Sequence, residues 1–116
     1  MNIERLHVGE KLSEVAIHNG VVYLAGQVAE DLSQDIAGQT REVLGHVDRL
    51  LAEAGSDKSR ILMCQIFLAD LNDIAAMNAV WMEWVAPGNS PPRATVQALL
   101  AKPEWRIEMV VTAAQK

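Results

Sequence analysis

The sequence has little cysteine and no long apolar run, and both shortages restrict the kind of protein it encodes. Cys64 is the only cysteine, so the chain forms no internal disulfide and no cysteine cluster for a metal. The longest apolar runs, such as residues 21–25 and 109–111, are far shorter than the roughly 20 residues that a transmembrane helix needs. Residues 1–12 carry charges where a secretory signal has an apolar stretch. We therefore expect a soluble cytoplasmic protein without a membrane partner.

Basic residues are also scarce. The chain has 10 Lys and Arg against 15 Asp and Glu, which gives a formal net charge of −5 at pH 7. The positive charges are scattered singly, whereas binding to a nucleic-acid backbone depends on clustered Lys and Arg. We therefore expect no nucleic-acid partner.

Aromatic residues make up only 4% of the chain, although hydrophobic residues make up 50%. The core must therefore consist mainly of aliphatic side chains and Met. A length of 116 residues is typical of one domain, so we expect a single domain over residues 1–116. Cys64 lies in the apolar stretch 61–69, which predicts a buried core thiol and not a nucleophile or a metal ligand.

Several short segments predict strands. Asn19-Gly20 lies between two β-prone runs and predicts a hairpin, because a type I′ turn needs positive φ at both central positions. Residues 3–8 predict a further strand at the edge of the sheet. The apolar stretch 61–69 predicts a buried strand because it is short and bounded by polar residues.

Two helices are predicted from apolar residues at three- and four-residue steps. The first spans about residues 33–54, with Asp31 or Ser33 as its N-cap. The second follows Asn72 or Asp73 as its N-cap and ends before the proline-containing loop 86–93. The apolar stripe of the second helix consists of Ile74, Met77, Trp81, Trp84 and Val85.

The last two predicted strands are residues 94–100 and 105–114, joined as a hairpin around residues 101–104. The whole order of elements predicts an α+β fold with both helices on one face of a sheet. The second face of such a sheet needs cover, and association with further copies of the chain provides it.

The C-terminal strands carry the best candidates for chemistry. Side chains alternate along a strand, so Arg93 and Thr95 share one face of the first strand and Glu108 lies on the polar face of the second. These faces are either simply solvated or line a cleft in which Arg93 binds a carboxylate and Glu108 handles a proton or a water. The predicted hairpin places Arg93 opposite Thr112 and about 13 Å from Glu108. Either the two residues bind separate ends of one ligand, or a neighbouring subunit supplies one of them.

Other candidates for a site are weaker. His7, His18 and His46 have no spacing typical of metal ligands, and the glycines form no phosphate-binding pattern, so we expect no metal. Trp81 and Trp84 occur at helical spacing, which indicates packing in the core or in an interface.

Four segments together resemble the RidA (YjgF) family: LAGQ at 24–27, DLNDIAAMNAVW at 70–81, PPRATVQ at 91–97 and WRIEMVVTAA at 105–114. The resemblance covers nearly the whole chain and is greatest to the small bacterial YoaB-type members. It implies a chorismate-mutase-like α+β fold with a mixed sheet, a homotrimer, and ligand clefts between subunits.

The resemblance also implies a function. Active members of the family are reactive-intermediate deaminases, which hydrolyse 2-imino or enamine acids to 2-oxo acids and ammonia without a cofactor. By resemblance, Arg93 binds the substrate carboxylate, Glu108 positions the hydrolytic water, and Asn78 lies in the cleft. Gly26 and Gln27 match a segment that edges the pocket.

Three positions depart from the family pattern. Thr95 stands where many members have cysteine, Ala25 where they often have serine, and a residue near Leu12 replaces a pocket tyrosine. Substrate size and the hydrogen bonds that hold water depend on such contacts. The sequence therefore leaves two functions open, a deaminase or a non-catalytic trimer that binds small carboxylates. It also leaves open whether Arg41 or Arg106 enters the cleft.

Overall fold

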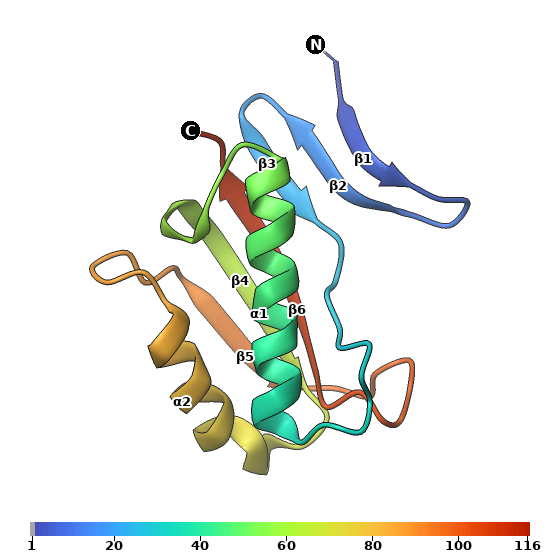
Figure 1. Cartoon of the computed structure of the whole chain (residues 1–116), viewed down its shortest axis with the longest axis vertical. Helices are drawn as coiled ribbons and strands as arrows, with labels where there is room; N and C mark the ends of the chain where they lie inside the picture. Colours follow the sequence, from blue (N-terminus) through green and yellow to red (C-terminus); the bar gives the residue numbers. More distant parts are fainter. Residues whose placement is uncertain (1) are drawn as a thin grey trace.

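The chain folds into one six-stranded sheet with two helices packed on one face (Figure 1). The computed structural model describes residues 2–116. The strands are β1 (Glu4–Val8), β2 (Ser13–His18), β3 (Val21–Leu24), β4 (Ile61–Leu68), β5 (Arg93–Gln97) and β6 (Ile107–Ala114). The helices are α1 (Ile36–Glu53) and α2 (Ile74–Trp84), with short 3₁₀ turns at Lys58–Arg60 and Leu71–Asp73. The predicted α+β fold with both helices on one face is thus confirmed.

The sheet has the strand order β1-β2-β3-β6-β4-β5. Only the β4–β5 pair is parallel, so the sheet is mixed. The predicted hairpin joins β2 to β3, with φ of 53° at Asn19 and 75° at Gly20. β1 lies at one edge of the sheet, as predicted, and β5 lies at the other.

The predicted N-cap of α1 is wrong. Asp31 closes a local turn, where its carboxylate accepts hydrogen bonds from the backbone N–H and the hydroxyl of Ser33. The helix starts later, and Asp35 caps it by accepting from the backbone N–H of Gly38 at 2.9 Å. Asp31 and Ser33 are therefore occupied with each other and are not available to the helix.

Asp73, one of the two predicted candidates, occupies the N-cap position of α2. Upstream of it, the carboxylate of Asp70 accepts a hydrogen bond from the backbone N–H of Asn72 at 2.9 Å and begins a 3₁₀ turn. This turn runs directly into α2, and Asp73 at the junction makes no capping hydrogen bond with its side chain. A short 3₁₀ turn at the start of an α-helix moves the capping side chain upstream.

The predicted hairpin between the two C-terminal strands is also wrong. β4 lies between β5 and β6 and pairs with both, so that Cys64 is aligned with Arg93 on one side and with Val111 on the other. β4 is the longest apolar stretch of the sheet, and a central position lets it form hydrogen bonds along both edges. The segment from 98 to 106 therefore crosses from one side of β4 to the other.

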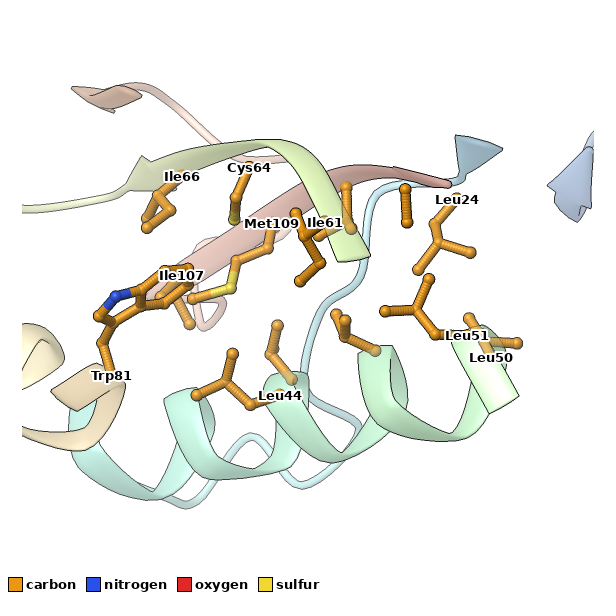
Figure 2. Packing of buried hydrophobic residues seen from close by; sticks show 14 of the residues in the cluster. Leu24, Leu44, Leu50, Leu51, Ile61, Cys64, Ile66, Trp81, Ile107 and Met109 are labelled. Carbon is orange, nitrogen blue, oxygen red and sulfur yellow. The ribbon is translucent and has the colours of Figure 1, made fainter. Parts of the chain in front are cut away.

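The core lies between the sheet and the helices (Figure 2). α1 contributes Leu44, Leu50 and Leu51, and β4 contributes Cys64 and Ile66. The core is mainly aliphatic, as the composition predicts. The opposite face of the sheet is only partly covered by the chain itself: Tyr23, Met63 and Val96 are 50%, 42% and 46% exposed. The strand predicted to be buried at 61–69 is thus buried on one face only.

Cys64 has the buried environment that the sequence predicts, with 1% of its surface exposed. Burial raises the pKa of the Cys64 thiol to about 12 and outweighs the opposite effect of the Arg93 guanidinium. We expect Ellman's reagent to leave the native protein unmodified at pH 8 and to react with one thiol after denaturation, because the thiolate is the reactive species. We expect Cys64→Ala to lower the free energy of unfolding by ~1 to 2 kcal/mol in a urea titration. Rapid modification of the native thiol would contradict this assignment.

Candidate functional site

Arg93 begins the edge strand β5 and points to the side of the sheet that carries the helices, because it is aligned with the buried Cys64. Its guanidinium meets one face of α2. Nη2 donates a hydrogen bond to Oδ1 of Asn78, and Nη1 lies 3.9 Å from Sδ of Met77. The guanidinium carbon lies 5.1 Å from the centroid of the Trp81 ring. α2 therefore holds Arg93 in place through three contacts.

All three partners of the Arg93 guanidinium are neutral. None of the ion pairs found among residues 2–116 includes Arg93. Arg93 also remains exposed to solvent. A guanidinium that is oriented but not neutralised is suited to bind a carboxylate through two parallel hydrogen bonds.

Glu108 points to the opposite face of the sheet, because its neighbours Ile107 and Met109 are buried in the core. It is aligned with Phe67 of β4 and is half-buried. The glutamate side chain lies against Gly26: a Cβ atom added there would overlap the carboxylate oxygen Oε2 and would lie 2.9 Å from Cδ. A glycine at this position therefore leaves room for the carboxylate.

The segment before and after Gly26 is fixed to β6 by backbone hydrogen bonds. The N–H of Gln27 donates to the carbonyl of Met109 at 2.8 Å, and the N–H of Met109 donates back at 3.1 Å. The side chain of Gln27 is buried and donates to the carbonyl of Ala25 at 2.9 Å and to the Glu14 carboxylate at 3.3 Å. The Gln27 amide thus stabilises the segment that positions Gly26 beside Glu108.

The predicted site residues form two separate groups in one chain. The arginine half-site consists of Arg93, Asn78 and Thr95, since Thr95 lies two residues after Arg93 on the same face of β5. The glutamate half-site consists of Glu108, Ala25, Gly26 and Gln27.

The two half-sites do not face each other. Arg93 and Glu108 are separated by three positions along β4 and by two strand spacings across the sheet, which is about 14 Å in the plane of the sheet. They also point to opposite faces. Side chains from the two half-sites of one chain therefore cannot contact the same small ligand.

The other charged candidates lie elsewhere. Arg41 lines a groove between α1 and α2 together with Trp84, and Arg106 lines a hollow with Asp70 and Asp73. His46 pairs with Glu42 on α1 at 3.0 Å. Within residues 2–116, no group of three or more His, Cys, Asp or Glu side chains is arranged to hold a metal ion. The part of the chain that the structure describes also contains no helix long and apolar enough to cross a bilayer.

Sequence reasoning missed the contact of Trp81 with Arg93. Trp81 was predicted to pack in the core or in an interface, and it is indeed 6% exposed. A usable signal was present, because Asn78 and Trp81 are three residues apart on a helix and therefore share a face. A long side chain that reaches Asn78 from the sheet, as Arg93 does, can therefore reach Trp81 as well.

Fold and site together define a class of protein: a small α+β domain with one mixed six-stranded sheet, two helices on one face, and separate arginine and glutamate half-sites. The sequence profile of the family described as Endoribonuclease L-PSP matches residues 2–115. The chain belongs to this family, the YjgF (RidA) family, as the resemblance predicted.

Relatives match the chain over nearly its whole length. A RutC family protein of Haemophilus influenzae is 52% identical over 114 residues, which cover 97% of this chain and 98% of that protein. The RutC family protein YoaB of Escherichia coli is 45% identical over 114 residues, which cover 98% of this chain and 99% of YoaB. The crystal structure of NMB1025 from Neisseria meningitidis, a member of the YjgF protein family, superposes with a TM-score of 0.96 at 44% identity, covering 100% of this chain and 97% of that one. These names state a family and no reaction.

Proposed function

We propose that the protein hydrolyses reactive 2-imino or enamine acids to 2-oxo acids and ammonia, in clefts between the subunits of a homotrimer. The observation that carries this proposal is the oriented guanidinium of Arg93, which has only neutral partners and faces solvent. Such a group suits the carboxylate that imino, enamine and oxo acids share.

The separation of the half-sites supports a cleft between subunits. The arginine half-site lies at the β5 edge, and the glutamate half-site lies on the uncovered face of the sheet. A neighbouring copy that covers this face can bring its own arginine half-site to Glu108 of the first copy. Exposed apolar side chains on that face, such as Tyr23 and Met63, favour such an association. In such a head-to-tail arrangement each copy contributes an arginine half-site to one neighbour and a glutamate half-site to the other, and three copies complete a closed ring.

The chemistry follows from the groups present. Arg93 binds the substrate carboxylate and fixes the adjacent C=N carbon, while Glu108 of the neighbouring copy orients a water molecule toward that carbon. The water oxygen forms a bond to the carbon as the C=N π bond opens, and the Glu108 carboxylate transfers one water proton to the nitrogen, which gives a carbinolamine. An enamine reaches this step as its imine tautomer. The proton of the new hydroxyl group then passes to the nitrogen as the C–N bond breaks, so that ammonia leaves and the carbon retains the oxygen as the C=O group of a 2-oxo acid. An imine is already activated toward water, so positioning and electrostatics are sufficient for this step.

A non-catalytic trimer that binds small carboxylates is the alternative function. It is favoured by the apolar side chains Ala25 and Leu12, which have no hydrogen-bonding group to hold a water. Leu12 lies in the turn between β1 and β2 and is 55% exposed. Arg93 is sufficient for binding in this case, and only the acceleration of hydrolysis is lost.

An assay of ammonia release separates the two functions. Imines are generated in situ by an amino-acid oxidase or a threonine dehydratase, and ammonia and 2-oxo acid are measured with and without the protein. We expect the protein to accelerate the release of both products above the rate with the generating enzyme alone. Binding of a 2-oxo acid without any acceleration would support the alternative, and the absence of both would contradict the carboxylate site itself.

The family description names a ribonuclease, but the charge of this chain does not support nucleic acid as its substrate. The net charge is −5, and the exposed Arg93 is a single cation next to neutral groups. A phosphate backbone is bound by several clustered cations. We therefore propose a small-molecule substrate.

Gly26 offers a test of the glutamate half-site that leaves Glu108 itself in place. A methyl group in Gly26→Ala overlaps the end of the flexible Glu108 side chain, so the carboxylate has to move while the backbone is retained. We expect kcat for imine hydrolysis to fall by about 10- to 100-fold, with little change in the Kd for a 2-oxo acid.

The matched control is Gly45→Ala, because nothing lies within 4 Å of a Cβ added at this exposed position of α1. It should leave kcat unchanged and raise the thermal midpoint slightly, since Ala favours a helix over Gly. Full turnover in Gly26→Ala would show that the position of Glu108 is not important for the reaction.

A further inference from the structure

Trp81 has a structural position that packing alone does not explain. The residue is 6% exposed, and the centroid of its ring lies 5.4 Å from that of Trp84, as expected of a core residue. The guanidinium of Arg93 also lies over this ring, with its central carbon 5.1 Å from the ring centroid. An indole ring attracts a cation placed within about 6 Å of its centroid, and Trp does so more strongly than Tyr or Phe.

The contacts of Arg93 occupy only part of its guanidinium. Arg has five N–H donors in one plane. One N–H of Nη2 is bonded to Asn78, Nη1 is near Met77, and the central carbon of the group lies over the Trp81 ring. These partners all come from one face of α2, so a rigid helix and not a loop sets the direction of the planar guanidinium group.

We propose that Trp81 is a positioning residue for the carboxylate site: its ring fixes the orientation of the Arg93 guanidinium, so that the free N–H groups are presented to the substrate carboxylate. As a statement about binding of a carboxylate substrate, this inference rests on the proposed function. The orientation of Arg93 itself does not depend on the reaction. Without the ring, Arg93 retains its charge and Asn78 as a partner, but it has to be ordered when the ligand binds, which weakens binding.

The test compares Trp81→Leu with Trp84→Leu. Both remove a Trp from the same helix, but only the first removes the ring beside Arg93. We expect Trp81→Leu to raise the KM for the imine and the Kd for 2-oxobutanoate by about 5- to 30-fold, with kcat within threefold of the unchanged protein. Trp84→Leu should leave KM and Kd within twofold.

A spectroscopic measurement reports the orientation of Arg93 directly. In a ¹⁵N-correlated NMR spectrum, the Nε–H signal of Arg93 should be shifted by the ring current of Trp81, and Arg93→Lys identifies it by its absence. We expect this shift to be lost in Trp81→Leu and kept in Trp84→Leu. If Trp81→Leu does not fold, Trp81→Phe retains a smaller ring, and it should show a reduced shift and an increase in Kd of about 2- to 5-fold.

The outcomes separate this inference from the proposed function. If the unchanged protein does not accelerate ammonia release, the proposed function fails, while the Arg93 signal and the binding of 2-oxobutanoate still decide the role of Trp81. If the two Leu variants change KM, Kd and the Arg93 signal equally, Trp81 is only a packing residue and the inference is wrong. It is also wrong if Trp81→Leu keeps the shifted Arg93 signal.

Discussion

Replacing Arg93 with Ala or Lys should weaken the binding of a 2-oxo acid by roughly 30- to 1000-fold. This range corresponds to the loss of about 2 to 4 kcal/mol for a charge-assisted bidentate contact in a partly dry cleft. Lys retains the positive charge but has no planar fork and cannot form two parallel hydrogen bonds with one carboxylate. It also lacks the flat group that lies over Trp81 and the second nitrogen that reaches Met77. The expected result is therefore a similar loss in both variants, measured by isothermal titration calorimetry.

Glu108→Gln is the control for this measurement. Gln has nearly the same shape as Glu but does not accept a proton, so kcat should fall while the Kd for a 2-oxo acid stays within a few-fold. The two substitutions thus separate binding of the carboxylate from activation of the water. If Arg93→Lys keeps full affinity and full turnover, the carboxylate role of Arg93 has to be abandoned.

Much of the fold follows from local signals in the sequence. The Asn19-Gly20 turn is determined by the backbone angles that its two residues tolerate, and these angles are local properties. The two helices follow from their apolar periodicity in the same way. The N-cap of α1 was mispredicted because several Asp and Ser side chains precede this helix, and each can accept from a different backbone N–H group. Only the folded structure shows that Asp31 bonds to Ser33 and leaves the cap of α1 to Asp35.

The pairing of β5 and β6 could not be predicted from their sequence proximity. A short connection between two strands favours a hairpin, but the insertion of β4 between them depends on long-range packing against α1 and α2. A clue was present in the apolar character of residues 61–69, since such a strand belongs in the middle of a sheet. The incorrect hairpin also led to an incorrect arrangement of the site residues. Two polar rows that a hairpin would place on one surface in fact lie on opposite faces, with Arg93 on one and Glu108 on the other.

The corrected register makes a strong prediction about mixtures of inactive chains. Arg93→Ala chains retain Glu108, and Glu108→Gln chains retain Arg93. In a head-to-tail ring, a site that takes Arg93 from one chain and Glu108 from the next is intact whenever the two variants adjoin in the right order. Random exchange at equal amounts makes about one quarter of the sites intact. We therefore expect the activity of the mixture to rise from near zero to about one quarter of the activity of the protein without substitutions.

A second mixture excludes a trivial explanation of this result. When unchanged chains are mixed with equal amounts of Arg93→Ala/Glu108→Gln chains, sites shared between neighbours remain intact in about one quarter of cases, whereas sites within one chain remain intact in about half. Exchange is verified by native mass spectrometry with one isotope-labelled variant, which should also give an assembly of three times the 12.7 kDa chain mass. No recovery in the first mixture and half activity in the second, with exchange complete, would place Arg93 and Glu108 in one site of one chain. Such a result cannot be reconciled with side chains on opposite faces of the sheet, so it would contradict both the shared cleft and the strand register on which it depends.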